Sequence, residues 1–356
     1  MSDDSAQFSG TMEVRERLKF DVAKLEAYLK QNVIGFQGPL DVAQFKGGQS
    51  NPSYMLTTPN RKYVLRRKPP GKLLPSAHAV DREYRVLTAL TNTEVPVPKT
   101  YCLCEDEDVI GTMFYVMEFL DGDIEWDPSL PNYSKANRVA VFDSMNAAMA
   151  SLHMVDYKSV GLESFGKPTD YLARQINRWT KQYKASETET VEAMDNLMAW
   201  LPENIPPGDE TAIVHGDYRL DNTVLNKDTH RVMGILDWEL ATLGHPLADF
   251  SYHCMTWRLE PELFRGLNGL DLPALGIPTE EQYVASYCER TGRDGIEHWD
   301  FYAAYNMFRL AAILQGIVGR VKDGTASNKN AADVAVRVKP LAIRGWEQAE
   351  KIIKGA

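Results

Sequence analysis

The chain has 356 residues, of which 44% are hydrophobic and 25% are charged, as is ordinary for a globular protein. The formal net charge of −10 argues against general binding to nucleic acid or anionic membranes, and we expect neither as a partner. No apolar run reaches the length of a membrane span, and the polar N-terminus is unlike a signal peptide. The four cysteines lack zinc or redox spacing, so we expect buried thiols and a cytoplasmic location.

The first third of the chain has the pattern of a small β-rich unit. Residues 1–12 are polar and small, which is typical of a mobile tail. Asp21 is expected to cap a helix with apolar residues at helical spacing, and a second helix is predicted over 81–90. Short strands are predicted at 43–45, 53–57, 62–67, 100–104 and 113–119. Residues 13–121 therefore form a predicted N-terminal, nucleotide-binding lobe with one main helix.

Beyond Asp121-Gly122 the pattern changes to long helices, which predicts a second lobe over residues 122–356. Apolar residues recur at helical spacing over 139–152 and 172–183. Thr279 and Gln282 predict a capping box, and Gly292 is expected to end that helix. A long helix is expected from Trp299, and Pro340 interrupts the last one. The predicted fold class is α+β, with a larger, mostly helical C-terminal lobe for catalysis and acceptor binding.

The most informative segment is HGDYRLDN at residues 215–222, followed by Asp237. Predicted strands at 212–214, 223–225 and 232–236 place Asp217, Asn222 and Asp237 at strand ends or in the loop between them. Phosphoryl transfer needs a carboxylate beside the attacking hydroxyl and oxygen ligands that hold Mg²⁺ against phosphates. We interpret Asp217 as the base or orienting group and Asn222 and Asp237 as the metal ligands. Aspartates that merely cap turns are the alternative.

These motifs resemble a known family. The HGD motif with Asn222, ILDWE at 235–239 and GHPLAD at 244–249 resemble the aminoglycoside phosphotransferase and choline kinase superfamily. GQSNP at 48–52 and YVLRRKPPGKLLPSAHA at 63–79 are similar to the kinase domain associated with acyl-CoA dehydrogenases. The resemblance covers nearly the whole chain. It implies a protein-kinase-like fold and an ATP- and Mg²⁺-dependent phosphotransferase that moves the γ-phosphoryl group to a small-molecule hydroxyl.

The segment FKGGQSN at residues 45–51 is the first candidate for phosphate binding. Backbone N–H groups of Gly47 and Gly48 can approach a phosphate closely, and Ser50 and Asn51 can donate as well. Considered alone, two glycines between strands are more often a hairpin turn. The position of the segment before the strand of Arg66 favours phosphate contact.

Arg66 occupies the place where a kinase strand carries its lysine. Strand alternation puts Arg66 on the same face as Val64, and Glu83 in the next helix is the expected ion-pair partner. Arginine keeps both the charge and the donors that phosphate binding needs. The adjacent Arg67 and Lys68 leave the register open, and a solvated basic strand edge is the alternative.

The stretch FYVMEFL at residues 114–120, followed by Asp121-Gly122, resembles the hinge of kinases. The resemblance implies that backbone groups of Glu118 and Leu120 meet the adenine edge. Arg219 is a candidate for a catalytic cation near the transferred phosphate, and an ion pair with Asp221 is the equal alternative. The resemblance further implies that Asp249 anchors the catalytic loop by accepting backbone N–H bonds, with a helix N-cap as the alternative.

The sequence is less informative about the histidines near the catalytic motif and about the identity of the acceptor. His153 and His215 are expected to be structural. Resemblance implies a hydroxyacyl-CoA acceptor and joint action with an acyl-CoA dehydrogenase. An aminoglycoside or amino-alcohol kinase, a nucleotide-binding pseudokinase-like module and a phosphohydrolase are the alternatives.

An acceptor pocket could be lined by Trp257, Trp299, Tyr302, Tyr305 and Arg309, although such aromatic residues are more often core. The cations proposed to meet CoA phosphates are Arg61, Lys62, Arg66, Arg67, Lys68 and Lys72.

Overall fold

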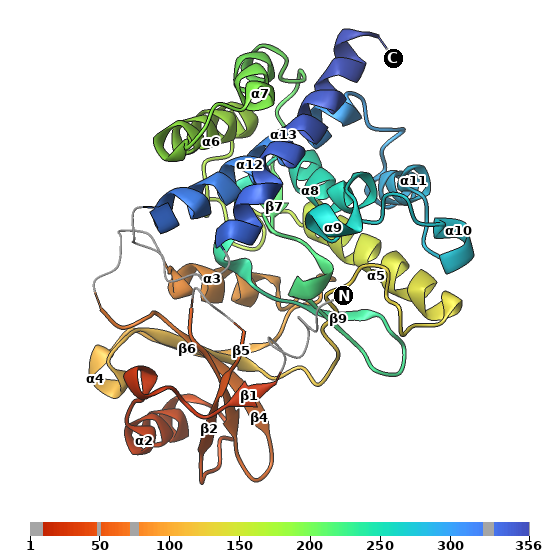
Figure 1. Ribbon diagram of the computed structural model, residues 1–356. Helices are drawn as coiled ribbons and strands as arrows, with labels where there is room; N and C mark the ends of the chain where they lie inside the picture. The colour runs from red at the N-terminus through yellow and green to blue at the C-terminus, as the bar shows by residue number, and fades with distance from the viewer. Residues whose placement is uncertain (1–9, 48–50, 72–77, 323–330, 356) are drawn as a thin grey trace. The chain divides into compact units, whose positions relative to one another are not determined.

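The computed structural model describes residues 10–47, 51–71, 78–322 and 331–355, which form two compact units (Figure 1). The first unit comprises Met1–Trp126, Asp156–Phe165 and Arg219–Ala241. The second comprises Asp127–Val155, Gly166–Tyr218 and Thr242–Ala356. The chain therefore passes from the second unit to the first at the peptide bond between Tyr218 and Arg219, within the HGDYRLDN segment.

A six-stranded antiparallel sheet with the order β1-β2-β3-β4-β6-β5 forms the centre of the first unit. Its strands are β1 (Thr11–Met12), β2 (Asp41–Phe45), β3 (Ser53–Thr57), β4 (Lys62–Arg67), β5 (Thr100–Cys104) and β6 (Phe114–Glu118). The last five of these correspond to the predicted strands. β1 falls within the tail predicted at 1–12, of which residues 1–9 lie outside the described residues.

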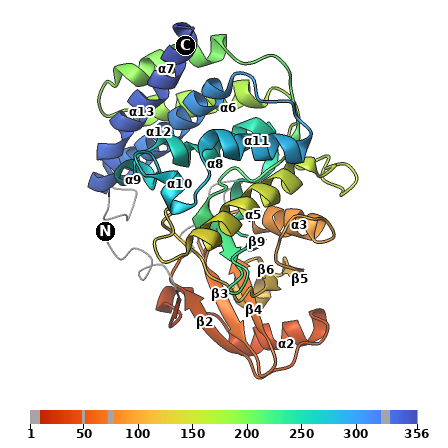
Figure 2. The ribbon, with the colours of Figure 1, turned by 90° about the vertical axis from the view of Figure 1, so that its right-hand side faces the viewer.

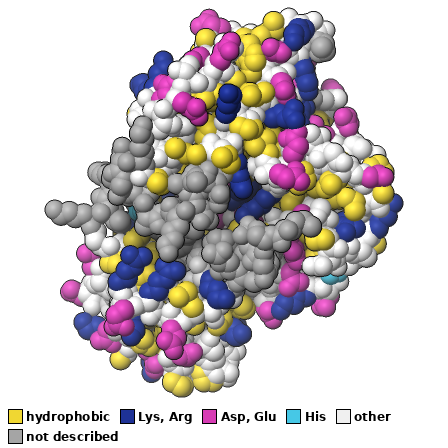
Figure 3. Space-filling view, in the orientation of Figure 1, with side chains coloured by type: hydrophobic (Ala, Val, Ile, Leu, Met, Phe, Trp, Pro, Cys, Tyr) yellow, Lys and Arg dark blue, Asp and Glu magenta, His cyan; other side chains and the backbone are white. Residues whose placement is uncertain are grey.

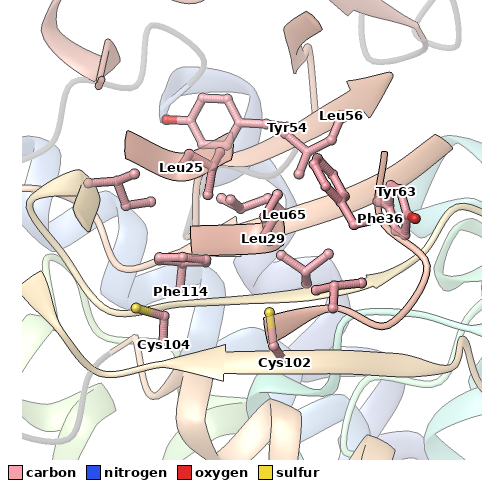
Figure 4. Packing of buried hydrophobic residues seen from close by; sticks show 13 residues of the cluster. Leu25, Leu29, Phe36, Tyr54, Leu56, Tyr63, Leu65, Cys102, Cys104 and Phe114 are labelled. Carbon is pink, nitrogen blue, oxygen red and sulfur yellow. The ribbon is translucent and has the colours of Figure 1, made fainter. Parts of the chain in front are cut away.

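Two helices cover opposite faces of this sheet. α2 (Val22–Asn32) begins at Asp21, whose carboxylate accepts the Ala23 and Lys24 N–H groups as predicted for an N-cap. Leu25 and Leu29 of α2 pack with every second residue of the strands in a buried cluster (Figure 4). α3 (Val80–Leu90) packs against β5 and β6 on the other face. Successive residues of β4 therefore point to different helices.

The first unit also contains the hairpin of β8 (Thr223–Leu225) and β9 (Val232–Ile235). Leu225 and Asp123 exchange two backbone hydrogen bonds of 2.8 Å, so the hairpin is bonded to the segment that follows β6. Ile235 N–H donates to the Pro96 carbonyl at 2.9 Å. A Cβ at Gly122 would collide with the Leu225 carbonyl oxygen, which explains why glycine stands there.

The second unit is mostly helical. Its longer helices are α5 (Lys135–Met154), α6 (Tyr171–Ser186), α7 (Glu192–Glu203), α8 (Pro246–Arg258), α11 (Glu280–Thr291), α12 (Trp299–Lys322) and α13 (Ala331–Ile353). α12 and α13 pack side by side (Figure 2). The Thr279 capping box is present, Gly292 ends α11 with φ 69°, and Pro340 lies inside α13. β7 (Ala212–Val214) pairs with β10 (Thr242–Gly244) in a separate antiparallel ribbon.

Short elements complete both units: η1 (Glu16–Leu18), α4 (Glu107–Ile110), η2 (Leu220–Asn222), η3 (Trp238–Leu240), α9 (Pro261–Phe264) and α10 (Leu272–Leu275). All four cysteines are buried free thiols, as expected. Acidic and basic side chains are interspersed over the face in Figure 3. Within the described ranges, no helix is both long and apolar enough to cross a membrane. The predicted α+β class, with a small antiparallel sheet unit and a larger helical unit, is confirmed.

Candidate active site

Glu83 of α3 is the centre of a buried polar cluster in the first unit. Its Oε2 lies 2.9 Å from Arg66 Nε, which is the ion pair expected from the sequence. The Tyr115 hydroxyl donates to Oε2 at 3.0 Å, and the Asn51 amide donates to Oε1 at 2.8 Å. Only 1% of the Glu83 side chain is exposed, so the Tyr115 and Asn51 donors and the Arg66 charge replace the water that a carboxylate otherwise needs. The cluster fixes the direction in which Arg66 points.

Arg66 and Arg67 are adjacent on β4, so their side chains lie on opposite faces of the sheet and contact different partners. Arg66 Nη2 lies 3.0 Å from Asp237 Oδ1, in addition to the pair with Glu83. Burial lowers the pKa of Arg66, but the Glu83 and Asp237 carboxylates outweigh it, and the net pKa is raised. Arg67 instead donates to the Ile110 and Leu18 carbonyls at 3.0 Å on the α2 side of the sheet. Arg66 is therefore the member of the basic run that faces Glu83 and Asp237.

The register of the β8–β9 hairpin brings Asn222 next to Asp237. Thr223 pairs with Ile235, and the Leu236 N–H donates to the Asn222 carbonyl at 2.8 Å. Asn222 is buried, whereas the Asp237 side chain is 38% exposed. Asp237 has a left-handed backbone with φ 64°, an uncommon conformation for a residue with a side chain. Strained backbone of this kind concentrates at functional sites.

Arg219 forms the ion pair with Asp221 that was the alternative to a catalytic role. Its Nη2 lies 3.0 Å from Asp221 Oδ2, and the Asp221 side chain is only 7% exposed. The pair is formed within the loop that joins Asp217 to Asn222. A catalytic role for Arg219 stays a prediction.

The predicted phosphate-binding segment is only partly described. Gly47 follows β2 and is half-buried, while Gly48 and Ser50 lie outside the described residues. Asn51 is fully buried, and its side chain is shared between Glu83 and His78, whose Nδ1 lies 3.1 Å from Asn51 Oδ1. The structure thus gives Asn51 a bracing position beside Glu83, which the sequence pattern did not predict.

The two predicted adenine contacts lie at the end of β6. The Glu118 N–H donates to the Lys99 carbonyl at 2.8 Å, and the Glu118 carboxylate accepts the Lys99 N–H at 3.3 Å. The Leu120 carbonyl accepts the Gly122 N–H at 3.1 Å. A Cβ at Gly234 would collide with Leu120 Cδ1, so β9 packs directly against this segment. Adenine binding here stays a prediction.

Asp249 holds the start of the HGDYRLDN segment in the second unit. Its carboxylate accepts the His215 and Gly216 N–H groups at 2.7 and 2.8 Å, whereas the N-cap of α8 is His245. The anchoring role implied by the resemblance is therefore found. Burial raises the pKa of Asp249, but its bonds to His153 and His215 outweigh burial, so the pKa is lowered. His153 is structural, as expected: its ring bonds Asp249 and the Tyr287 hydroxyl.

Asp217 follows Gly216, whose φ of 84° is a left-handed conformation that favours glycine. The Tyr252 hydroxyl of α8 donates to Asp217 Oδ1 at 2.7 Å. Arg309 of α12 donates through Nη2 to the Gly216 carbonyl at 2.6 Å. Tyr252 was not predicted from the sequence, and no local pattern could find it, because it lies 35 residues from Asp217.

The aromatic residues considered for an acceptor pocket mostly belong to the core, which was the alternative interpretation of the sequence. Trp257, Tyr302 and Tyr305 are buried, and Trp257 donates its indole N–H to the Pro278 carbonyl at 2.8 Å. Trp299 is half-buried and donates to Glu280 at 2.8 Å. Arg309 is buried too, and it reaches the catalytic segment by a hydrogen bond to the Gly216 carbonyl.

Comparison with known proteins identifies relatives of this arrangement. The model of the phosphotransferase enzyme family matches residues 41–304. Acyl-CoA dehydrogenase family member 10 of Mus musculus is 44% identical over 345 residues, which are 96% of this chain and 32% of that protein. The chain thus spans about a third of the length of this relative.

Two of the solved structures that match the chain illustrate the shared fold. A protein of Ralstonia eutropha JMP134, provisionally named an aminoglycoside phosphotransferase, is 55% identical with a TM-score of 0.87, covering 94% of this chain and 99% of that one. Choline kinase of Cryptosporidium parvum Iowa II is 13% identical with a TM-score of 0.65, covering 94% and 97%, and shows the fold alone. The predicted protein-kinase-like fold and the class of small-molecule O-phosphotransferase are confirmed. The chain belongs to the phosphotransferase enzyme family.

Proposed function

We propose that the protein transfers the γ-phosphoryl group of ATP, with Mg²⁺, to a hydroxyl of an acyl-CoA thioester. Nucleotide binding is supported by the position of the Arg66 guanidinium, which is held by Glu83 and also reaches Asp237. A cation fixed by a buried carboxylate is the arrangement that kinases use on the α- and β-phosphates. Arg66 offers a planar fork of donors for such an anion and keeps its charge at every physiological pH.

The side chains proposed for Mg²⁺ fit a hard cation. Asn222 and Asp237 would supply amide and carboxylate oxygens from adjacent ends of β8 and β9. Mg²⁺ is commonly held by one or two carboxylates together with substrate phosphates and water, so a dedicated protein cage is not required. In the part of the chain that is described, no group of three or more His, Cys, Asp or Glu residues could hold a metal ion. When bound, the ion would neutralise charge that develops on the transferred phosphoryl group.

The residues of the second unit support the proton chemistry. The acceptor O–H would give its proton to the Asp217 carboxylate as its oxygen bonds the γ-phosphorus and the bond to the β,γ-bridging oxygen breaks, releasing ADP. Tyr252 and Asp249 hold Asp217 and the preceding backbone, so little reorganisation is needed at the moment of transfer.

The acceptor is proposed from the relatives and from charge. The mouse relative is named an acyl-CoA dehydrogenase family member, and this chain would act before such an enzyme on a hydroxylated acyl-CoA. Because Arg66 is assigned to ATP and Arg67 is buried and bonded to backbone carbonyls, the CoA phosphates would contact neighbours such as Lys68, whose side chain is 29% exposed and lies 3.8 Å from Asp81. Lys72, also proposed from the sequence, lies outside the described residues.

A second candidate acceptor is an aminoglycoside or amino alcohol. The name of the Ralstonia relative favours it, and a net charge of −10 suits a cationic substrate. ADP release measured with a hydroxyacyl-CoA, an aminoglycoside and choline distinguishes the candidates. We expect release only with the hydroxyacyl-CoA. A cationic acceptor with the higher kcat/KM would reject the CoA proposal, and no ADP with any acceptor would reject the kinase activity.

The Lys68 proposal has its own control. Lys68→Gln should raise KM for the hydroxyacyl-CoA and leave KM for ATP unchanged, since a cation near the CoA phosphates contributes only to acceptor binding. Lys30→Gln, which removes an exposed lysine paired with Glu26, should change neither value. A parallel rise of both KM values in the Lys68 variant would assign Lys68 to ATP instead.

A further inference from the structure

The catalytic segment is held in the second unit from two sides at Gly216. Asp249 accepts the Gly216 N–H at 2.8 Å, and Arg309 donates to the Gly216 carbonyl at 2.6 Å. Both holding side chains are charged and buried, with Asp249 at 3% and Arg309 at 7% exposure. Hydrogen bonds to charged groups are stronger than those between neutral groups. The backbone immediately before Asp217 is therefore fixed on both sides.

With the backbone fixed, the remaining freedom of Asp217 is rotation of its side chain. The Tyr252 hydroxyl donates to Asp217 Oδ1 at 2.7 Å, the short distance typical of an O–H bond to a carboxylate. Tyr252 is itself buried at 5% exposure on α8. A rigid aromatic side chain can thus hold one carboxylate oxygen and set the direction of the other.

Arg309 also fixes the tyrosine. Its guanidinium carbon lies 4.8 Å from the Tyr252 ring centroid and 5.7 Å from that of Trp179. These distances are within the range of cation–π attraction, which is stronger where water is excluded. One buried arginine from α12 thereby contacts both the backbone before Asp217 and the ring that reaches the Asp217 carboxylate.

We propose that Tyr252 is a positioning residue that orients the Asp217 carboxylate toward the acceptor hydroxyl, with Arg309 holding Tyr252 in place. This inference rests on the proposed phosphotransfer by Asp217. Tyr252 acts through Asp217 and does not touch the nucleotide. Its loss therefore slows the transfer step and leaves nucleotide binding as it is.

The test compares Tyr252→Phe with wild type, using the acceptor found by the screen above. Removing the hydroxyl should lower kcat about 10–100-fold, the cost of a slightly misplaced catalytic group, with KM for ATP unchanged. Tyr283→Phe is the matched control, because it removes a buried hydroxyl bonded to His253 Nε2 at 2.9 Å. That control should keep the wild-type kcat, and melting temperatures of both variants show whether each is folded.

A double-mutant cycle tests whether Tyr252 acts through Asp217. In the Asp217→Asn background, Tyr252→Phe should cause no further loss, since residues that act as one unit are not additive. Arg309→Lys gives a second approach: it keeps the cation, loses the planar fork, and should lower kcat without raising KM for ATP. Wild-type kcat in Tyr252→Phe, or an equal loss in both backgrounds, would overturn the positioning role. Inactive wild-type protein would instead reject the proposed function.

Discussion

Arg66 and Glu83 form an ion pair, 2.9 Å between Nε and Oε2, in which both side chains are almost fully buried. Removing the Glu83 charge leaves the buried Arg66 to pair with Asp237, whose side chain is 38% exposed. Glu83→Gln should therefore lower the free energy of unfolding by about 3–5 kcal/mol and raise KM for ATP. Urea denaturation and steady-state kinetics measure the two effects.

The control for this variant is an exposed ion pair of similar length. Lys354 Nζ lies 2.8 Å from Glu350, with 67% of the lysine side chain exposed. Lys354→Ala should change stability by less than about 1 kcal/mol. A Glu83→Gln variant as stable as this control would mean that the pair with Asp237 is sufficient to stabilise the buried Arg66 charge.

Asp217→Ala should reduce kcat by about 10²–10⁴-fold, the usual contribution of a positioned acid–base group. ATP binding should persist, because the residues proposed to bind the nucleotide are different ones. Fluorescence titration with an ATP analogue and kcat together measure this. Asp228→Ala, in the exposed turn between β8 and β9, serves as the control and should keep wild-type kcat. Undiminished kcat in the Asp217 variant would refute the catalytic assignment.

Asp237→Asn should move half-saturation by Mg²⁺ to a higher concentration, because a hard cation loses a charged oxygen ligand. Activity titrated against Mg²⁺ at saturating ATP gives the value. Asn in place of Asp keeps the side-chain shape, so a folding defect is not expected. An unchanged half-saturation would place the metal on other oxygens, with Asp221 as the next candidate.

The buried His253 should make the free energy of unfolding depend on pH. Burial lowers the pKa of His253 to about 4. Because the unfolded chain takes up the proton first as pH falls below 6.5, the free energy of unfolding should fall by roughly 3 kcal/mol between pH 6.5 and pH 4. His253→Gln should remove most of that slope and leave the profile above pH 7 as in wild type. A variant with the full wild-type slope would show that other groups cause it.

The sequence was most predictive where one strand or turn sets the geometry. Alternation along β4 favoured Arg66 over its neighbours, and Glu83 in the helix after β4 was the expected partner that Arg66 pairs with. Tyr252 and Arg309 could not be found this way, because they reach the catalytic segment from distant helices and carry no motif of their own. Likewise, only the fold reveals that β7 pairs with β10 while β8 pairs with β9.

The discontinuous first unit has a consequence for synthesis on the ribosome. Its sheet is complete by Glu118, but the β8–β9 hairpin bonded to Asp123 and Pro96 comes only after Arg219. Arg82 of α3 likewise donates to the carbonyls of Phe165 and Ala241, which are synthesised later. The incomplete first unit must therefore persist while about 80 residues of the other unit are made, a period in which exposed sheet edges invite chaperone binding.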